Sequence, residues 1–338
     1  TTSAADGWFN MAVNGGAELV VDFRLDNYLP VQRRLRVPWN DYTFSADVVM
    51  IQQDTVSTVV SMASSDTQTA RGSMVSDDRG DRTPTLIFPA QTAAKARTKD
   101  GLMKGMDNLT VRATEYTVGD MGPDRMPGIL PATSGYTHAI ELSADEVGAE
   151  GWVEFDEPVY YYLENFLEFP TGVTVPSGYY DRAEGLWLAG PDGRVVEVLE
   201  TGSGLAEIDV DGDGVADTGQ ALEDLDFTDG ERQQLAGLYA EGTTLWRVPI
   251  PHFTPWDHNW PFGPPPGADG PPGDESDDPA DGNNQTDDPC QQSGSIIFCE
   301  DQLLGESLPV VGTEHQLYYN SSRVPDFIKG MSTTVRVT

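Results

Sequence analysis

One short stretch of the sequence carries carboxylates at a spacing suited to a metal ion. From Asp209 to Asp217 the chain reads Asp-Val-Asp-Gly-Asp-Gly-Val-Ala-Asp, with acidic residues at alternate positions through Asp213. Oxygen ligands at this spacing can surround one hard cation such as Ca²⁺, and Gly214 permits the sharp turn. The predicted ligands are Asp209, Asp211, Asp213, the Val215 carbonyl oxygen, Asp217 and Gln220.

This loop departs from a complete EF-hand. Its twelfth position is Gln220 instead of a bidentate Glu, so Glu223 or Asp224 would have to supply that ligand from further along the chain. No long helix is expected before the loop. The pattern therefore predicts an isolated calcium loop with a structural ion, which would tether the preceding hairpin to a helix that begins at Thr228. The alternative is a solvated acidic turn.

Other residues that could do chemistry are sparse. The chain has four histidines. His252, Asp257 and His258 offer a set of zinc ligands, but the prolines and aromatic residues among them favour a packed segment. No Gly-x-Ser-x-Gly motif, Cys-x-x-Cys pair or Gly-rich phosphate loop is present. We therefore expect no catalytic residues and no organic cofactor, and a zinc hydrolase is the enzymatic alternative.

The two cysteines, Cys290 and Cys299, lie close together in polar sequence. A disulfide between them is feasible and would suit an oxidising compartment. Two free thiols are the alternative.

Charge restricts the partners. The chain has 55 acidic and 20 basic residues, a formal net charge of −35. Such a surface repels phosphate backbones, so a nucleic-acid partner is not expected. The acidity fits divalent cations or a high-salt environment, and composition does not separate the two. No apolar run reaches the length of about 18 residues that a transmembrane helix needs, so no membrane insertion is expected in this segment.

The pattern of elements predicts a mostly β fold of tandem small β-sandwich units, with one or two short helices and a Pro-rich acidic linker. The 35 glycines and 24 prolines favour short strands and ordered turns. The expected units are an incomplete sandwich at 1–62, a sandwich at 63–165, a hairpin with the calcium-type loop and a helix at 166–248, an aromatic Pro-rich strap with an acidic linker at 249–289, and the start of another β domain at 290–338.

One helix has a clear start signal. Thr228 is its expected N-cap and Glu231 completes a capping box. Leu235, Leu238 and Tyr239 follow at helical spacing on one face, which we expect to be buried.

The strap is the aromatic, Pro-rich stretch 249–261, which reads Pro-Ile-Pro-His-Phe-Thr-Pro-Trp-Asp-His-Asn-Trp-Pro. We expect a polyproline-like extended segment whose aromatic side chains lie in a groove. The acidic run from Asp274 to Asp288 follows it and cannot build a core.

Two stretches carry a family resemblance. Asp-Gly-Trp-Phe-Asn-Met-Ala-Val-Asn-Gly-Gly at 6–16, with Pro-Trp-Asn at 38–40, resembles the last part of the transthyretin-like (carboxypeptidase regulatory-like) domain of teneurins and bacterial RHS/YD-repeat proteins. The stretches 305–313 and 317–325 resemble the opening of the fibronectin-plug domain of the same family. The sequence between them, including 175–182, resembles the long segment that bacterial RHS proteins carry there.

The resemblance implies a scaffold. In this family a YD-repeat shell forms a hollow barrel that the plug domain seals, bacterial members enclose or present a C-terminal toxin, and teneurins act in cell adhesion. This sequence contains no YD repeats, complete plug or effector, so toxin activity and shell self-cleavage are not carried over. Both ends are expected to be cut from a longer chain.

The expected function is that of a non-catalytic structural segment of a large secreted or cell-surface protein, adjoining the plug of the repeat shell and stabilised by Ca²⁺. Its expected partners are its own YD-repeat shell and plug domain, together with a cell-surface partner. The alternative is a calcium-dependent adhesion module that recognises a cell surface or glycan. An open aromatic groove at the strap would favour adhesion, whereas a buried strap would favour the scaffold.

Overall fold

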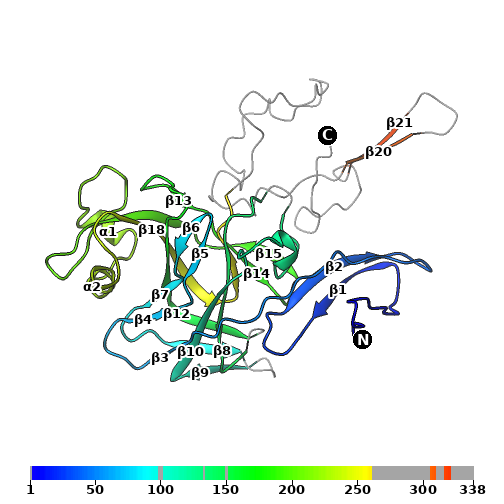
Figure 1. The fold of residues 1–338 in the computed structure, drawn as a ribbon, viewed down its shortest axis with the longest axis horizontal. Helices are drawn as coiled ribbons and strands as arrows, with labels where there is room; N and C mark the ends of the chain where they lie inside the picture. The colour runs from blue at the N-terminus through cyan, green and yellow to red at the C-terminus, as the bar shows by residue number, and fades with distance from the viewer. Residues whose placement is uncertain are drawn as a thin grey trace.

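The computed structural model describes residues 2–97, 102–131, 134–148, 151–260, 305–309 and 316–320. Strands dominate these ranges and the helices are short, so the predicted mostly β fold is confirmed (Figure 1). The predicted Cys290–Cys299 disulfide and the acidic linker lie outside the described residues. In the predicted last domain, β20 (Gly305–Pro309) and β21 (Gln316–Asn320) form an antiparallel hairpin.

Two sheets make up the main body of the molecule. The first has six strands in the order β15 (Leu186–Ala189), β14 (Gly178–Asp181), β19 (Pro255–Asp257), β11 (Ala139–Ala144), β10 (Asn108–Glu115) and β3 (Thr58–Ser61).

The second sheet has nine strands. Its main path is β13 (Thr174–Val175), β16 (Gly193–Glu200), β18 (Thr243–Phe253), β12 (Trp152–Glu164), β7 (Thr85–Phe88) and β4 (Gln68–Arg71). Off this path, β17 (Glu207–Asp209) pairs with β16, β8 (Ala94–Arg97) with β12, and β9 (Met103–Met106) with β8.

Side chains alternate between two cores along β12. Tyr161 and Leu163 face the core that lies between the two sheets, while Tyr160 and Tyr162 face a second core on the opposite side of the nine-stranded sheet. Successive strand residues point to opposite faces, which produces this alternation. The helices α1 (Gln220–Glu223) and α2 (Asp229–Leu238) cover the second core. They lie at one end of the molecule, away from the N-terminal strands (Figure 1).

Strand pairing joins ranges that were expected to be separate units. The predicted boundary at residue 165 is crossed in both sheets, because β12 pairs with β18 and β11 pairs with β19. Residues 58–260 therefore form one body, and the predicted division into 63–165 and 166–248 is corrected. Local sequence patterns identify strands but do not reveal which distant strands pair.

The strap is part of this body. Its residues continue β18 and then form β19, so the extended conformation is as predicted but the groove is not. Trp256 and Phe253 are buried in the core between the sheets. Among the described strands, β16 pairs with β18 over residues 243–247 and no further. Pro249 and Pro251 therefore lie where β12 is the remaining neighbour. A proline costs fewer ladder hydrogen bonds at such a position.

The N-terminal region contributes β1 (Ala17–Phe23) and β2 (Val31–Val37), which pair with each other in a two-stranded sheet. The hairpin β5 (Val75–Asp77) and β6 (Gly80–Arg82) and a 3₁₀ turn at Gly122–Arg125 complete the described elements. The N-terminal region is attached through Arg33, whose guanidinium donates to the Met126 and Asp124 carbonyl oxygens. Leu29 is buried in a small apolar cluster that also contains Tyr116 and Tyr180.

Helix α2 begins where the sequence predicts. The Thr228 hydroxyl oxygen accepts from the Glu231 amide at 3.1 Å, and Leu235 and Tyr239 are buried. The reciprocal half of the predicted capping box does not form, because the Glu231 carboxylate turns into the core and binds Arg247.

Candidate metal site and buried charge networks

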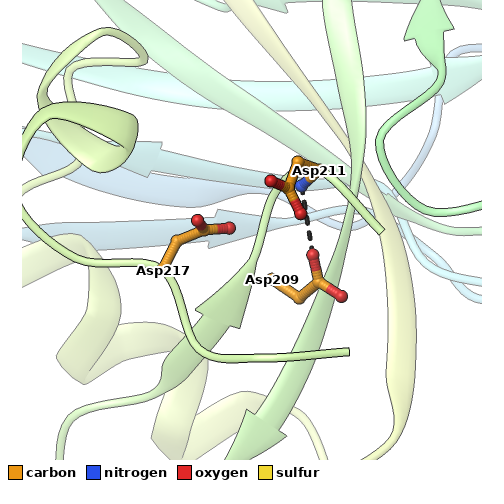
Figure 2. A group of neighbouring side chains, drawn as sticks. All are labelled: Asp209, Asp211 and Asp217. Atoms are coloured by element: carbon orange, nitrogen blue, oxygen red, sulfur yellow. Dashed lines mark hydrogen bonds between the residues drawn. The ribbon is translucent and has the colours of Figure 1, made fainter. Parts of the chain in front are cut away.

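The acidic loop follows β17 and leads into α1. Asp209 at the end of β17 is buried, Asp217 is half-buried and Asp211 is exposed. Ligand oxygen atoms of the three carboxylates lie within 4.8 Å of one another (Figure 2). In the part of the chain that the structure describes, this is the one group of three acidic, His or Cys side chains that gather so closely.

Backbone amides fold the loop around the Asp209 carboxylate. Its Oδ1 accepts from the Gly212 amide at 2.6 Å and the Asp211 amide at 3.1 Å, and its Oδ2 accepts from the Gly214 amide at 2.8 Å. Gly212 and Gly214 have φ of 86° and 78°, a conformation that glycine adopts without a steric cost. The sequence therefore specifies the loop through one buried acceptor and two glycines.

Carboxylate oxygens remain available for a cation. Asp217 Oδ2 accepts from the Val210 amide at 2.7 Å, and Asp211 Oδ1 accepts from the Asp213 amide at 3.1 Å. Among the described atoms, the second oxygen of each of these two carboxylates has no hydrogen bond. Three carboxylates this close repel one another, and a divalent cation is the species that relieves this repulsion.

The structure gathers three of the six predicted ligands. The Asp213 carboxylate is exposed and accepts from the Val215 amide at 2.8 Å, outside the group of three. Gln220 starts α1, and its amide donates to Asp224 Oδ1 at 2.6 Å. The side chain of Val215 is exposed and has no ligand atom, so the backbone carbonyl oxygen is the one ligand that this residue could offer.

The loop is fixed to the body on its other side. A Cβ on Gly172 would lie 2.4 Å from the Asp211 carbonyl oxygen, and one on Gly212 would lie 2.5 Å from the Thr171 carbonyl oxygen. Ile208 and Val210 are buried in the second core. An ion here would therefore stabilise the junction between the nine-stranded sheet and its helices.

A buried charge network lies beneath α2 and was not anticipated from the sequence. Arg247 Nε and Nη2 donate to Glu231 Oε1 and Oε2 at 2.8 and 3.0 Å, and the Tyr162 hydroxyl donates to Oε1 at 2.6 Å. The guanidinium lies 3.7 Å from the ring centre of Tyr160 and 4.0 Å from that of Phe227. Burial alone would lower the pKa of Arg247, but Glu231 and Tyr162 outweigh it and raise this pKa.

A second network crosses from the β5–β6 hairpin to β10. Arg82 is fully buried, and its Nη2 lies 2.7 Å from Glu115 Oε1 and 2.8 Å from Asp77 Oδ2. His138 Nδ1 lies 3.6 Å from Glu115 Oε1. Burial would raise the pKa of Glu115, but His138 and Arg82 outweigh it and lower this pKa to about 2.

A third network joins Glu141 to Arg182 and Tyr116. Arg182 Nη2 donates to Glu141 Oε2 at 2.6 Å, and the Tyr116 hydroxyl donates to the same oxygen at 2.5 Å. Every charge in the three networks has an opposite charge within bonding distance, as a structural role requires. Their signal in the sequence is weak, because the Arg82–Glu115 and Arg182–Glu141 pairs join residues 33 and 41 positions apart.

The residues of the zinc alternative do not form a common site. His252 stacks on Trp152 with ring centres 4.1 Å apart, whereas His258 stacks on His138 and Tyr161. Within the described ranges they belong to no cluster of three metal-ligating side chains. Both rings are packed in aromatic surroundings instead.

Comparison with known proteins relates the N-terminal part of the chain to teneurins. The family model of the teneurin TTR-like domain matches residues 1–50. No curated protein and no solved structure matches the chain. The resemblance of the first 50 residues is thus confirmed, while the RHS/YD-repeat and fibronectin-plug resemblances remain predictions. None of the helices in the described ranges is long and apolar enough to span a membrane.

Proposed function

We propose that this chain is a non-catalytic structural segment of a large extracellular or cell-surface protein related to teneurins and RHS/YD-repeat proteins. The match of residues 1–50 to the teneurin TTR-like domain supports both the relationship and the extracellular location. In the full-length protein the segment adjoins the plug of the repeat shell, and that shell and plug are its partners.

The burial of the strap is the main support for the scaffold role. Trp256, Phe253 and His258 are at most 1% exposed and lie inside the body of residues 58–260. An adhesion module would need aromatic side chains open to a ligand, such as a glycan. The strap instead links both sheets, which favours a rigid connecting body over the adhesion alternative.

Calcium is the second part of the proposal. Asp209, Asp211 and Asp217 supply carboxylate oxygens, and the Val215 carbonyl adds another oxygen, as a hard cation prefers. The bound ion ties the end of β17 to the start of α1. Its contribution is structural: it neutralises the three carboxylates and stabilises the helices against the nine-stranded sheet.

The test is thermal unfolding of the chain in EDTA and in millimolar CaCl₂. Wild type and the matched control Asp213→Asn gain stability with calcium, by about 2.7 kcal/mol when the ion is present at 100 times its Kd. The double variant Asp211→Asn/Asp217→Asn shows no calcium-dependent shift. An unchanged melting temperature in wild type, or an equal shift in the double variant, contradicts calcium binding at this loop.

A further inference from the structure

The β8–β9 hairpin concentrates positive charge on an acidic molecule. Lys95, Lys99 and Lys104 are three of the four lysines in the chain, and Arg97 lies among them, although the net charge is −35. Lys95, Arg97 and Lys104 belong to the described residues and all three side chains are exposed. The rest of the molecule offers no comparable density of lysine in the sequence.

This hairpin also ends the nine-stranded sheet with an open edge. β8 lies between β12 and β9, while β9 has β8 as its one partner among the described strands. The outer backbone groups of β9 are therefore available to another extended segment. Apolar side chains accompany them, since Leu102 and Met103 are 69% and 41% exposed.

The basic side chains have few competing contacts. Residues opposite each other in register share a face, so Lys95, Arg97 and Met103 lie on the same face of the hairpin. The Arg97 guanidinium lies 5.4 Å from the ring centre of Trp152. Glu154 on β12 is opposite Lys95 but forms no ion pair with it, and within the described residues neither Lys95 nor Lys104 has a hydrogen-bond or ion-pair partner.

We propose that the β8–β9 hairpin is the docking site for the acidic run Asp274–Asp288 of the same chain. This run carries seven acidic residues and no basic one, so its charge complements that of the hairpin. An extended connection from Trp260 to Asp274, at about 3.4 Å per residue, reaches roughly 48 Å.

The covalent link within the chain favours the acidic run over a second molecule or a membrane as the binding partner of the hairpin. A linked segment acts at an effective concentration in the millimolar range, without the cost of bringing two molecules together. A second copy of the chain, or an anionic membrane, must instead approach a molecule whose net charge of −35 repels it. Docking would place an acidic strand against β9 and shield the exposed Met103.

Cys290 lies two positions beyond the acidic run and can carry a spin label in a Cys299→Ser variant of the full chain. Paramagnetic broadening is then read on ¹³C-labelled methionine methyl groups. Docking predicts loss of the Met103 and Met106 signals, while the exposed Met74 and Met121 keep theirs. The lost signals return at about 1 M salt, where the screening length falls to about 3 Å.

Matched variants assign the contact. Lys95→Glu/Lys104→Glu restores the Met103 and Met106 signals, whereas Arg36→Glu, which reverses an exposed charge on β2, leaves them broadened. Unbroadened Met103 and Met106 signals in the spin-labelled Cys299→Ser chain would overturn the proposal. The lysines would then serve only to prevent edge-to-edge pairing of β9 with other strands. Broadening that appears only between labelled and unlabelled copies would also overturn it, because the occupant is then a second molecule. Binding of the hairpin to phosphatidylserine vesicles without intramolecular broadening would overturn the proposal as well.

Discussion

The body of residues 58–260 and the N-terminal region of residues 2–52 use aromatic residues in opposite ways. Trp246 and Trp256 are fully buried in the body, whereas Trp8 and Trp39 are 68% and 74% exposed. The body has two large sheets and two cores that receive its aromatic side chains, but the described N-terminal region has one two-stranded sheet. Strand partners, more than residue type, therefore decide which aromatic residues become core.

Charge follows the same division. Glu231 and Arg247 pair at 2.8 Å in the interior, whereas Glu18 and Arg34 pair at 3.7 Å on the surface of the N-terminal hairpin. Solvent screens the second pair and leaves the first almost unscreened. The two pairs allow the difference between the regions to be measured.

The largest loss of stability is expected when the interior pair of Glu231 and Arg247 is broken. Glu231→Ala leaves the Arg247 guanidinium buried without its carboxylate, which should cost about 3–5 kcal/mol of unfolding free energy. The matched control Glu18→Ala should cost less than about 1 kcal/mol. Urea unfolding measures both. Equal losses would show that the interior of the body is as accessible to water as the hairpin surface.

The second-largest effect is expected at acidic pH, where the free energy of unfolding of the body should fall. Burial lowers the pKa of His252 to about 4, against a partial opposing effect of Asp181. Between its ordinary pKa of 6.5 and about 4, the unfolded chain binds more protons, so stability is complete above this window and falls as the pH drops. Burial also lowers the pKa of His258 and acts in the same direction.

The expected loss from His252 between about pH 7.5 and pH 5 is roughly 2 kcal/mol. Urea unfolding at the two pH values measures it, and His252→Phe should remove most of this part of the loss. Residues 2–52 contain no histidine, so no histidine of the N-terminal hairpin contributes to the loss of stability in acid. An identical pH dependence in His252→Phe would count against a buried neutral ring.

A smaller effect is expected at the start of α2. Thr228→Ala removes the hydroxyl that accepts from the Glu231 amide, which should cost about 1 kcal/mol. Thr228→Ser keeps the acceptor and serves as the control. If both variants lose the same stability, the cap contributes nothing and the helix depends on packing alone.

The smallest effect is expected in the N-terminal region. Tyr42 is 87% exposed, so Tyr42→Ala should change the free energy of unfolding by less than about 0.5 kcal/mol. Thermal and urea unfolding check this. A loss of several kcal/mol would mean that the side chain is covered in solution and would remove the contrast with the body.

The sequence predicted those features that depend on neighbouring residues. Thr228 and the apolar spacing that follows it located α2, and the alternating aspartates located the loop whose carboxylates gather in the structure. Tyr161 and Tyr162 illustrate what was not predictable, because the face that each occupies depends on β18 and β7, strands that lie far away in the sequence. Pro249 and Pro251 suggested a polyproline segment, since nothing local shows that β18 lacks a second neighbour there.

We proposed above that a calcium ion bound by Asp209, Asp211 and Asp217 ties the helices of the body to its nine-stranded sheet. Native-state hydrogen exchange in EDTA and in calcium tests this most directly. Calcium should slow the amides of residues 208–217 and α2, together with those of β18, and leave β1 and β2 unchanged; Asp211→Asn/Asp217→Asn should abolish the slowing. Exchange that calcium leaves unaltered throughout 208–238, or alters equally in the double variant, would contradict a structural calcium ion at this loop.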